Sequence, residues 1–225
     1  MTSTFLRFAE SYESPVFRGR GFTLEEFQDW YASEHAGVFT YYEDWVGFNF
    51  PSHVIDDFTP NKFGAFSRKE HWVLDQLKDA EGNYYVIASA VGNPAIEQEL
   101  VHAMFHINQD YARAVEGVVA EYKFEAFRNT LVKMGYSETV LVDEINAYLV
   151  TGLVKSLYRK STKDVQSCVP RLSALAKGAF GFDLNDTPAV LRFLRDEVHH
   201  IDGASVQSGQ PLSSESPMDC GSVSM

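Results

Sequence analysis

The sequence has little cysteine, a shortage of basic residues and no long apolar run. Its two cysteines, Cys168 and Cys220, lie far apart, so neither a disulfide framework nor a cysteine-based zinc site is expected. The 19 Lys and Arg residues are outnumbered by 31 Asp and Glu, which gives a formal net charge of −12. Such a surface repels phosphate backbones and anionic lipids. We therefore expect no nucleic-acid partner and no membrane partner.

The first residues, "MTSTFLRFAESYESPVF", lack the charged start and apolar core of a signal peptide. No apolar run reaches the roughly 20 residues needed to cross a bilayer. We therefore expect a cytoplasmic protein. The hydrophobic content of 45%, with 17 Phe and 11 Tyr, predicts a well-packed globular core. The sequence carries no signal for an oligomeric state.

The chain is predicted to form one domain over residues 1–202, with a core at about 10–152 and a helical extension at 153–202. The last segment, residues 203–225, contains seven serines and almost no large apolar side chains. It cannot bury enough surface to offset the entropy of ordering. We expect it to be a disordered tail.

The hydrophobic pattern predicts an α+β fold that is mostly helical. The clearest strand is Tyr84–Ala90, rich in aromatic and β-branched residues, with Asn93 and Pro94 opening the next helix. Thr23 and Glu26 form a capping-box pair at the start of an early helix. Residues 37–58 are expected to give loop, a short strand or turn, and a short helix. Further helices are predicted at 69–77, 110–122, 125–136, 137–158, 164–180 (interrupted by Pro170) and 187–200.

The sequence "QELVHAMFH", residues 98–106, carries the polar residues of the helix that follows the strand. At 100° per residue, Gln98, Glu99, His102 and His106 share about a third of the helical wheel. Most of the remaining surface of this helix is apolar, which predicts burial. Buried polar side chains need hydrogen-bond partners, charge partners or a metal ion.

"QELVH" differs by one residue from the HExxH motif of zinc hydrolases. In that motif two ligands four residues apart share one metal ion, and the Glu beside the first ligand takes a proton from a metal-bound water. Gln98 holds the first ligand position, Glu99 the base position and His102 the second ligand position.

The strand "YYVIASAV", the helix "QELVHAMFHINQDY" and the later "LVDEINAYLV" together resemble a zincin-like domain of the gluzincin type, with a small sheet packed on the motif helix. The resemblance covers about residues 10–152. It implies Glu99 as general base, with His102 and Glu144 as metal ligands. Tyr148, one turn after Glu144, is expected either to hydrogen-bond in that site or to pack in the core. The departure is Gln98, because an amide oxygen is a weaker donor to zinc than imidazole.

His106 offers a second ligand set. His102, His106 and Glu144 would supply two histidines and one carboxylate, which also suits non-haem iron(II). In the alternative without a metal, the two histidines are core residues bonded to carboxylates or carbonyls. Asp143 and Asn146 are expected to point away from Glu144 into solvent.

Three functions are therefore weighed. The first is a metal-dependent enzyme of hydrolase ancestry, with zinc or iron at an altered site, acting on a peptide, a protein or a small molecule. The second is a catalytically inactive zincin-like module that binds a peptide or protein partner. The third is a non-haem iron oxygenase.

Overall fold

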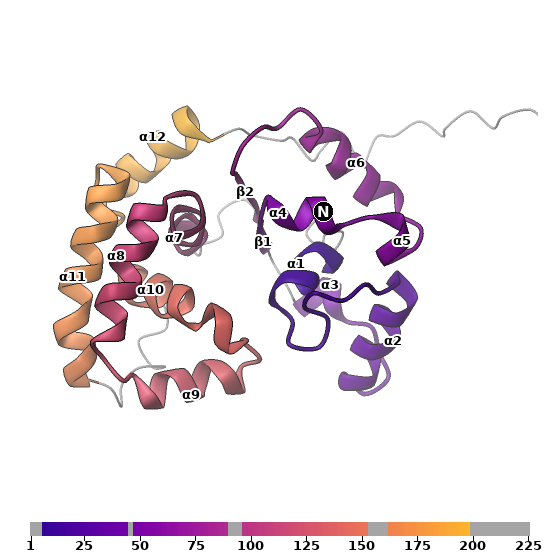
Figure 1. Ribbon diagram of the computed structural model, residues 1–225, viewed down its shortest axis with the longest axis horizontal. Helices are drawn as coiled ribbons and strands as arrows, with labels where there is room; N and C mark the ends of the chain where they lie inside the picture. Colours follow the sequence, from indigo (N-terminus) through magenta and orange to yellow (C-terminus); the bar gives the residue numbers. More distant parts are fainter. Residues whose placement is uncertain (1–5, 45–46, 90–95, 153–161, 199–225) are drawn as a thin grey trace, which may run out of the picture.

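The computed structural model describes residues 6–44, 47–89, 96–152 and 162–198, and it shows helices arranged on both sides of a two-stranded antiparallel sheet (Figure 1). The predicted α+β, mostly helical fold is confirmed at this level. The expected end of the strand at Ala90, the helix start at Asn93 and Pro94 and the tail at 203–225 lie outside the described residues.

The described residues of the first half of the chain form six helices and both described strands. They are α1 (Leu6–Glu13), α2 (Leu24–Glu34), α3 (Tyr41–Asp44), β1 (Gly47–Pro51), α4 (His53–Asp57), α5 (Pro60–Phe63), α6 (Arg68–Leu77) and β2 (Tyr85–Ser89). The second half is helical over its described residues: α7 (Ile96–Ile107), α8 (Gln109–Ala120), α9 (Glu125–Lys133), a 3₁₀ turn (Glu138–Val140), α10 (Leu141–Thr151), α11 (Thr162–Phe180) and α12 (Thr187–Glu197).

The predicted capping box at α2 is confirmed. The backbone N–H of Glu26 donates to Oγ1 of Thr23 at 3.1 Å, and the Glu26 carboxylate accepts from the Thr23 backbone N–H at 2.6 Å. These two bonds satisfy backbone donors that the first turn of a helix leaves without partners. The helix accordingly begins at Leu24, directly after its cap.

The sheet separates two hydrophobic cores, because side chains alternate between its faces. Phe48 and Phe50 of β1 belong to the core formed with α1, α2 and α4 to α6, and Val86 of β2 packs against the same core. Ile87 packs instead against the core formed by α7 to α12. Asn49 is paired with Ile87 in the register. Asn49 therefore points toward the C-terminal helices.

A buried ion pair fixes α1 within the N-terminal half. The guanidinium of Arg7 donates to both carboxylate oxygens of Glu70 at the start of α6, and also to the backbone oxygen of Phe63. Arg7 and Glu70 are both almost completely buried. This network orients the helix whose later residues, Tyr12 and Glu13, approach the second half of the chain.

Two helices differ from expectation. α11 continues through Pro170 without interruption. Proline has no N–H, so Pro170 cannot donate a hydrogen bond to the carbonyl of Gln166 one turn earlier. Both residues are exposed, so water can satisfy that carbonyl. The helix predicted at 137–158 divides into a 3₁₀ turn and α10, which ends at Gly152 in the left-handed conformation with φ of 67°. In the described part of the chain, no helix combines the length and the apolar character that a membrane span requires.

Candidate functional site

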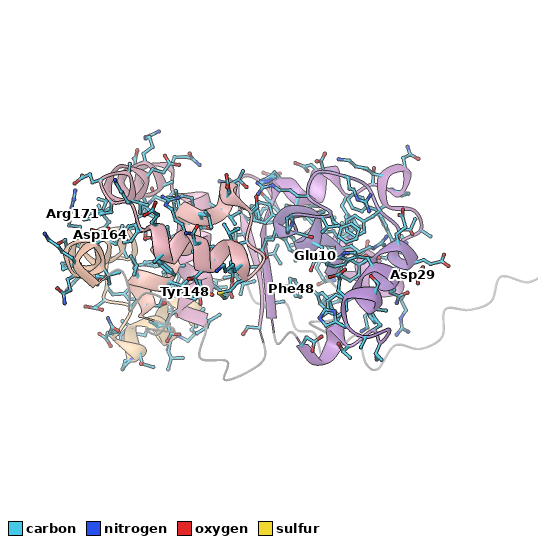
Figure 2. The ribbon with its side chains drawn as sticks, turned by 90° about the horizontal axis from the view of Figure 1, so that it is seen from below. Glu10, Asp29, Phe48, Tyr148, Asp164 and Arg171 are labelled. Carbon is cyan, nitrogen blue, oxygen red and sulfur yellow. The ribbon has the colours of Figure 1, made fainter. Side chains whose placement is uncertain are left out.

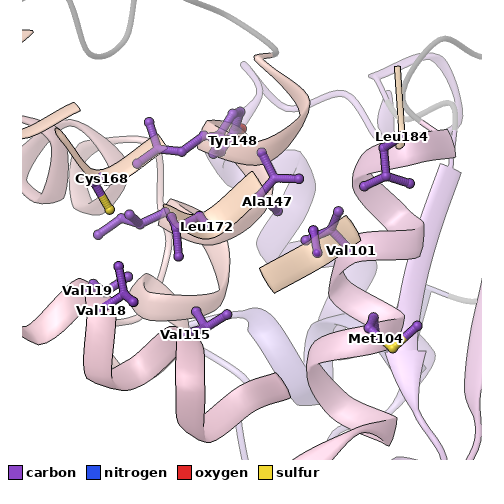
Figure 3. Packing of buried hydrophobic residues seen from close by; sticks show 14 of the residues in the cluster. Val101, Met104, Val115, Val118, Val119, Ala147, Tyr148, Cys168, Leu172 and Leu184 are labelled. Atoms are coloured by element: carbon purple, nitrogen blue, oxygen red, sulfur yellow. The ribbon is translucent and has the colours of Figure 1, made fainter. Parts of the chain in front are cut away.

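The predicted site lies where α7, carrying the "QELVH" residues, packs against α10, carrying Glu144. Val101 of α7 and Ala147 of α10 are completely buried in the same core (Figure 3). Alanine adds little bulk, so it permits a close approach of the two helices. The polar side chains beside this contact are thereby held inside the protein.

His102 lies between two consecutive acidic residues of α10. Its Nδ1 atom is 2.9 Å from Oδ2 of Asp143, and its Nε2 atom is 3.8 Å from Oε1 of Glu144. All three side chains are more than 90% buried. Because the Asp143 carboxylate accepts the Nδ1–H proton, Nε2 is the ring nitrogen that faces Glu144.

His106, one turn further along α7, contacts α1 and Asp143. Its Nε2 atom is 2.9 Å from the Tyr12 hydroxyl and 3.3 Å from Oδ2 of Asp143. The ring of Tyr85 from β2 is stacked on the imidazole at 5.1 Å between centroids. His106 thus shares one carboxylate oxygen with His102.

Glu99 is held by residues of the sheet. Asn49 donates a hydrogen bond from its amide to Oε2 of Glu99, and the hydroxyl of Tyr85 donates to the amide oxygen of Asn49. Asn49 and Tyr85 reach α7 because the alternation of both strands turns them toward the C-terminal helices. Glu99 remains half-buried.

Gln98 is hydrogen-bonded to Tyr148, the neighbour predicted for the site. The Tyr148 hydroxyl also lies 3.3 Å from the hydroxyl of Tyr136. Figure 2 shows Tyr148 among the C-terminal helices, and Glu10 among the N-terminal helices, on either side of β1. The residue at the first ligand position of the motif is therefore engaged within the protein.

The site gathers carboxylates from both halves of the chain. Burial, with a further contribution from the charge of Glu144, raises the pKa of Glu13 well above its ordinary value. Burial also raises the pKa of Glu144 and of Glu10 to about 7, and that of Glu99 above its ordinary value. An interior position that lacks enough positive charge favours the protonated form of such groups.

The pKa of the histidine at the centre is also raised, but by a different cause. Burial alone would lower the pKa of His102, but the negative charges of Asp143 and Glu144 outweigh burial and raise it well above its ordinary value. Burial likewise opposes ionisation of Asp143, yet the charge of His102 and its hydrogen bond lower the pKa of this carboxyl. Asp143 and His102 thus form an ion pair in the absence of any other cation.

The expectation that Asp143 and Asn146 are solvated is wrong. Both are buried, and Asn146 is hydrogen-bonded to the hydroxyl of Tyr111. The reason is that α10 is buried over Leu141 and over every residue from Asp143 to Val150. A helix enclosed on all sides has no solvated face, so wheel position cannot predict exposure.

The sequence reasoning also missed four residues of the site: Tyr12, Glu13, Asn49 and Tyr85. They come from α1 and from the two strands, far from α7 in the sequence. The one local signal was the alternation Phe48-Asn49-Phe50, in which a polar residue between two buried aromatics marks a strand face turned away from the aromatic core.

The donor chemistry of this cluster fits a cation. Oδ1 of Asp143 and Oε2 of Glu144 are buried and have no hydrogen-bond partner among the described residues. Two ligands of one tetrahedral ion, each about 2.1 Å from it, lie about 3.5 Å apart, close to the separation of His102 Nε2 and Glu144 Oε1. Over the described ranges, no three His, Cys, Asp or Glu side chains already converge on one metal position.

Comparisons of the chain with protein-family models, with curated proteins and with solved structures gave no match in any of the three.

Proposed function

We propose that this protein is a metal-dependent enzyme of zincin and hydrolase ancestry, built on a zincin-like domain with an altered metal site. His102 and Glu144 would hold the ion, and Asp143 would orient the imidazole. One observation carries the proposal: Nδ1 of His102 is bonded to Asp143 while Nε2 faces Glu144. Histidine ligands of metals commonly have their outer nitrogen fixed by a carboxylate in this way.

A bound zinc or iron ion would polarise a substrate carbonyl and lower the pKa of a bound water. Glu99 occupies the position of the general base on α7. Its hydrogen bond from Asn49 fixes the carboxylate, and burial raises its pKa, which makes it a stronger base than an ordinary glutamate. The substrate class consistent with this chemistry is a peptide, a protein or a small molecule that contains a carbonyl group.

The missing histidine leaves the third protein donor to be assigned. The amide of Gln98 is hydrogen-bonded to Tyr148, and Nε2 of His106 is directed at Asp143 and Tyr12. Glu13 of α1 is a further candidate, since the charges of Glu144, His102 and Glu99 act on its carboxyl. Carboxylates are good ligands for both zinc and iron. Among the residues that the structure describes, neither Glu13 nor His106 already converges with His102 and Glu144 on one metal position, so variants of both residues are needed to assign the third donor.

The test is metal analysis of untagged protein purified without chelator, followed by titration of the chelator-treated protein with Zn²⁺ and, anaerobically, with Fe²⁺. The variants are His102→Gln, Glu144→Gln, Glu13→Gln and His106→Gln. Two exposed residues outside the site supply matched controls, His71→Gln and Glu116→Gln. Circular dichroism of each variant verifies that it is folded.

About one ion per chain, lost in His102→Gln and Glu144→Gln and retained in both controls, supports the proposal. Loss in Glu13→Gln with retention in His106→Gln assigns the third donor to Glu13, and the converse result assigns it to His106. Stoichiometric iron with oxygen-dependent turnover would instead favour the oxygenase. Folded protein that takes up neither ion would overturn the metal-enzyme proposal.

The second candidate is a zincin-like module that binds a peptide or protein without catalysis. The bond between Gln98 and Tyr148 favours it, because the group at the first ligand position is already engaged. This candidate predicts that Glu99→Gln leaves every binding property intact. The enzyme proposal predicts loss of turnover in that variant with metal content unchanged.

A further inference from the structure

A small cavity with a basic lining lies beside α1, outside the candidate metal site. It has a volume of about 150 Å³ and lies between the end of α1, the loop that follows it, α4 and α5. Its lining includes Arg18, Arg20 and Lys62, together with His53. The one acidic residue in the lining is Asp57.

The charge of this cavity is opposite to that of the whole chain. A protein with a net charge of −12 has few basic residues, yet three of them meet here. Lys62 is paired with Asp57 at 3.2 Å. Arg18 and Arg20 lie over the rings of Tyr12 and Phe17 at 5.6 and 4.9 Å. Arg18 also donates a hydrogen bond from one guanidinium nitrogen to the Thr139 hydroxyl, but neither arginine forms an ion pair with a carboxylate of the described residues. The cavity therefore has uncompensated positive charge.

The chemistry of the two arginines suits an oxyanion. Guanidinium groups are planar and donate two parallel hydrogen bonds to a carboxylate or a phosphate. A volume of 150 Å³ corresponds to about five waters at roughly 30 Å³ each, well below the roughly 300 Å³ or more of a site for a whole drug-sized ligand. The cavity is large enough for one charged group of a ligand whose remainder lies outside it.

Tyr12 connects the cavity to the candidate metal site. It lines the cavity, and its ring meets His53 edge-on at 5.8 Å. The same ring meets His106 edge-on at 5.7 Å, and its hydroxyl is hydrogen-bonded to His106. A ligand anchored in the cavity would extend along this ring toward the acidic residues of α7 and α10.

We propose that this cavity binds the oxyanion group, a carboxylate or a phosphate, of a ligand that reaches the candidate metal site. The acidic interior repels an anionic group and the basic cavity attracts it, so the two together fix the direction in which the ligand lies. The part of the proposal that concerns reach depends on the proposed function, but binding of the anion itself does not.

The test is a titration of the chelator-treated full chain with N-acetylglutamate and, separately, with inorganic phosphate. Binding is monitored by NMR chemical shifts at low ionic strength. Removal of metal separates this experiment from the test of the metal site. The pocket variant is Arg18→Met combined with Arg20→Met. The control is Arg192→Met combined with Arg195→Met, two exposed residues of α12 whose loss changes the net charge equally.

The expected result is saturable binding with shifts at Tyr12 and His53, weakened at least 10-fold in the pocket variant and unchanged in the control. Saturation by N-acetylglutamate alone identifies a carboxylate site, and saturation by phosphate alone identifies a phosphate site. Equal weakening in both double variants would overturn the proposal, because it would reveal a non-specific effect of net charge. Absence of saturable binding of either anion by the parent chain would overturn it as well.

Discussion

His102 and Asp143 are paired through Nδ1 and Oδ2 at 2.9 Å, and this bond determines which nitrogen of the ring faces Glu144. Without the carboxylate, the imidazole could carry its proton on either nitrogen and could rotate. With it, Nε2 is the nitrogen directed at Glu144, a buried carboxylate with one oxygen that has no hydrogen-bond partner among the described residues. The expected consequences of this arrangement can be measured.

Replacement of Gln98 by histidine restores the HExxH motif and should create a stronger metal site. Imidazole is a better zinc donor than an amide oxygen. Loss of a residue that only hydrogen-bonds a metal ligand already changes metal affinity by about 10-fold or more, so we expect the gain of a direct ligand to raise the zinc affinity by more than about 10-fold. Competition with a chromophoric chelator measures it. Gln76→His, at an exposed position of α6, is the control. Equal affinities in the parent and in Gln98→His would show that position 98 does not border the ion.

Asp143→Asn should weaken metal binding without removing a ligand. The amide no longer accepts a full charge-assisted bond from Nδ1, so the imidazole loses basicity and orientation, and we expect a loss of about 10–100-fold in affinity. The same chelator competition gives the value. Asp110→Asn, at an exposed position of α8, should have no effect. A normal affinity in Asp143→Asn would mean that His102 does not act as a ligand.

Glu10 provides a prediction about pH. Its pKa is raised by burial from 4.5 to about 7, so the folded state holds a proton that the unfolded state releases between these values. Stability from this group is therefore present at low pH and falls as the pH rises from about 4.5 to 7. Glu10→Gln should leave the chelator-treated protein about as stable at pH 5 and more stable at pH 8, on the order of 2–3 kcal/mol.

Urea unfolding at the two pH values measures the effect, with Glu116→Gln on the exposed face of α8 as control. If Glu10→Gln changed the free energy of unfolding equally at pH 8 and at pH 5, the charge of Glu10 would not be the cause of the change. A loss at both would indicate that the hydrogen bond from the Tyr41 hydroxyl, at 3.4 Å, matters more than the desolvation of the carboxyl.

The ion pair of Arg7 with Glu70 should be costly to break. Glu70→Ala leaves a guanidinium buried with one charge partner removed, and such a loss costs about 3–5 kcal/mol. Asp57→Ala removes the partner of Lys62 in an exposed pair, for which we expect roughly 1 kcal/mol or less. Denaturant midpoints of the two variants give the comparison. Similar values would show that water reaches Arg7 in Glu70→Ala.

The part of the site that lies on α7 could be read from the sequence, because helical spacing alone brings Glu99, His102 and His106 to one face. Glu144 came from the resemblance of its motif. Tyr12 and Asn49 could not be found in this way, since their approach to α7 depends on how α1 and the sheet pack against a helix distant in the sequence. The error at Asp143 has a different origin: the periodicity gives the direction of a side chain and says nothing of what surrounds the helix.

The sheet has a further consequence for how this protein is made. The polar residues of α1 and β1 are synthesised well before those of α7, and Glu144 of α10 comes later still. Until α10 has left the ribosome and packed against α7, His102 has neither of its carboxylate neighbours. The site therefore cannot be complete before α10 is in place, and its appearance would report that the two halves of the chain have met.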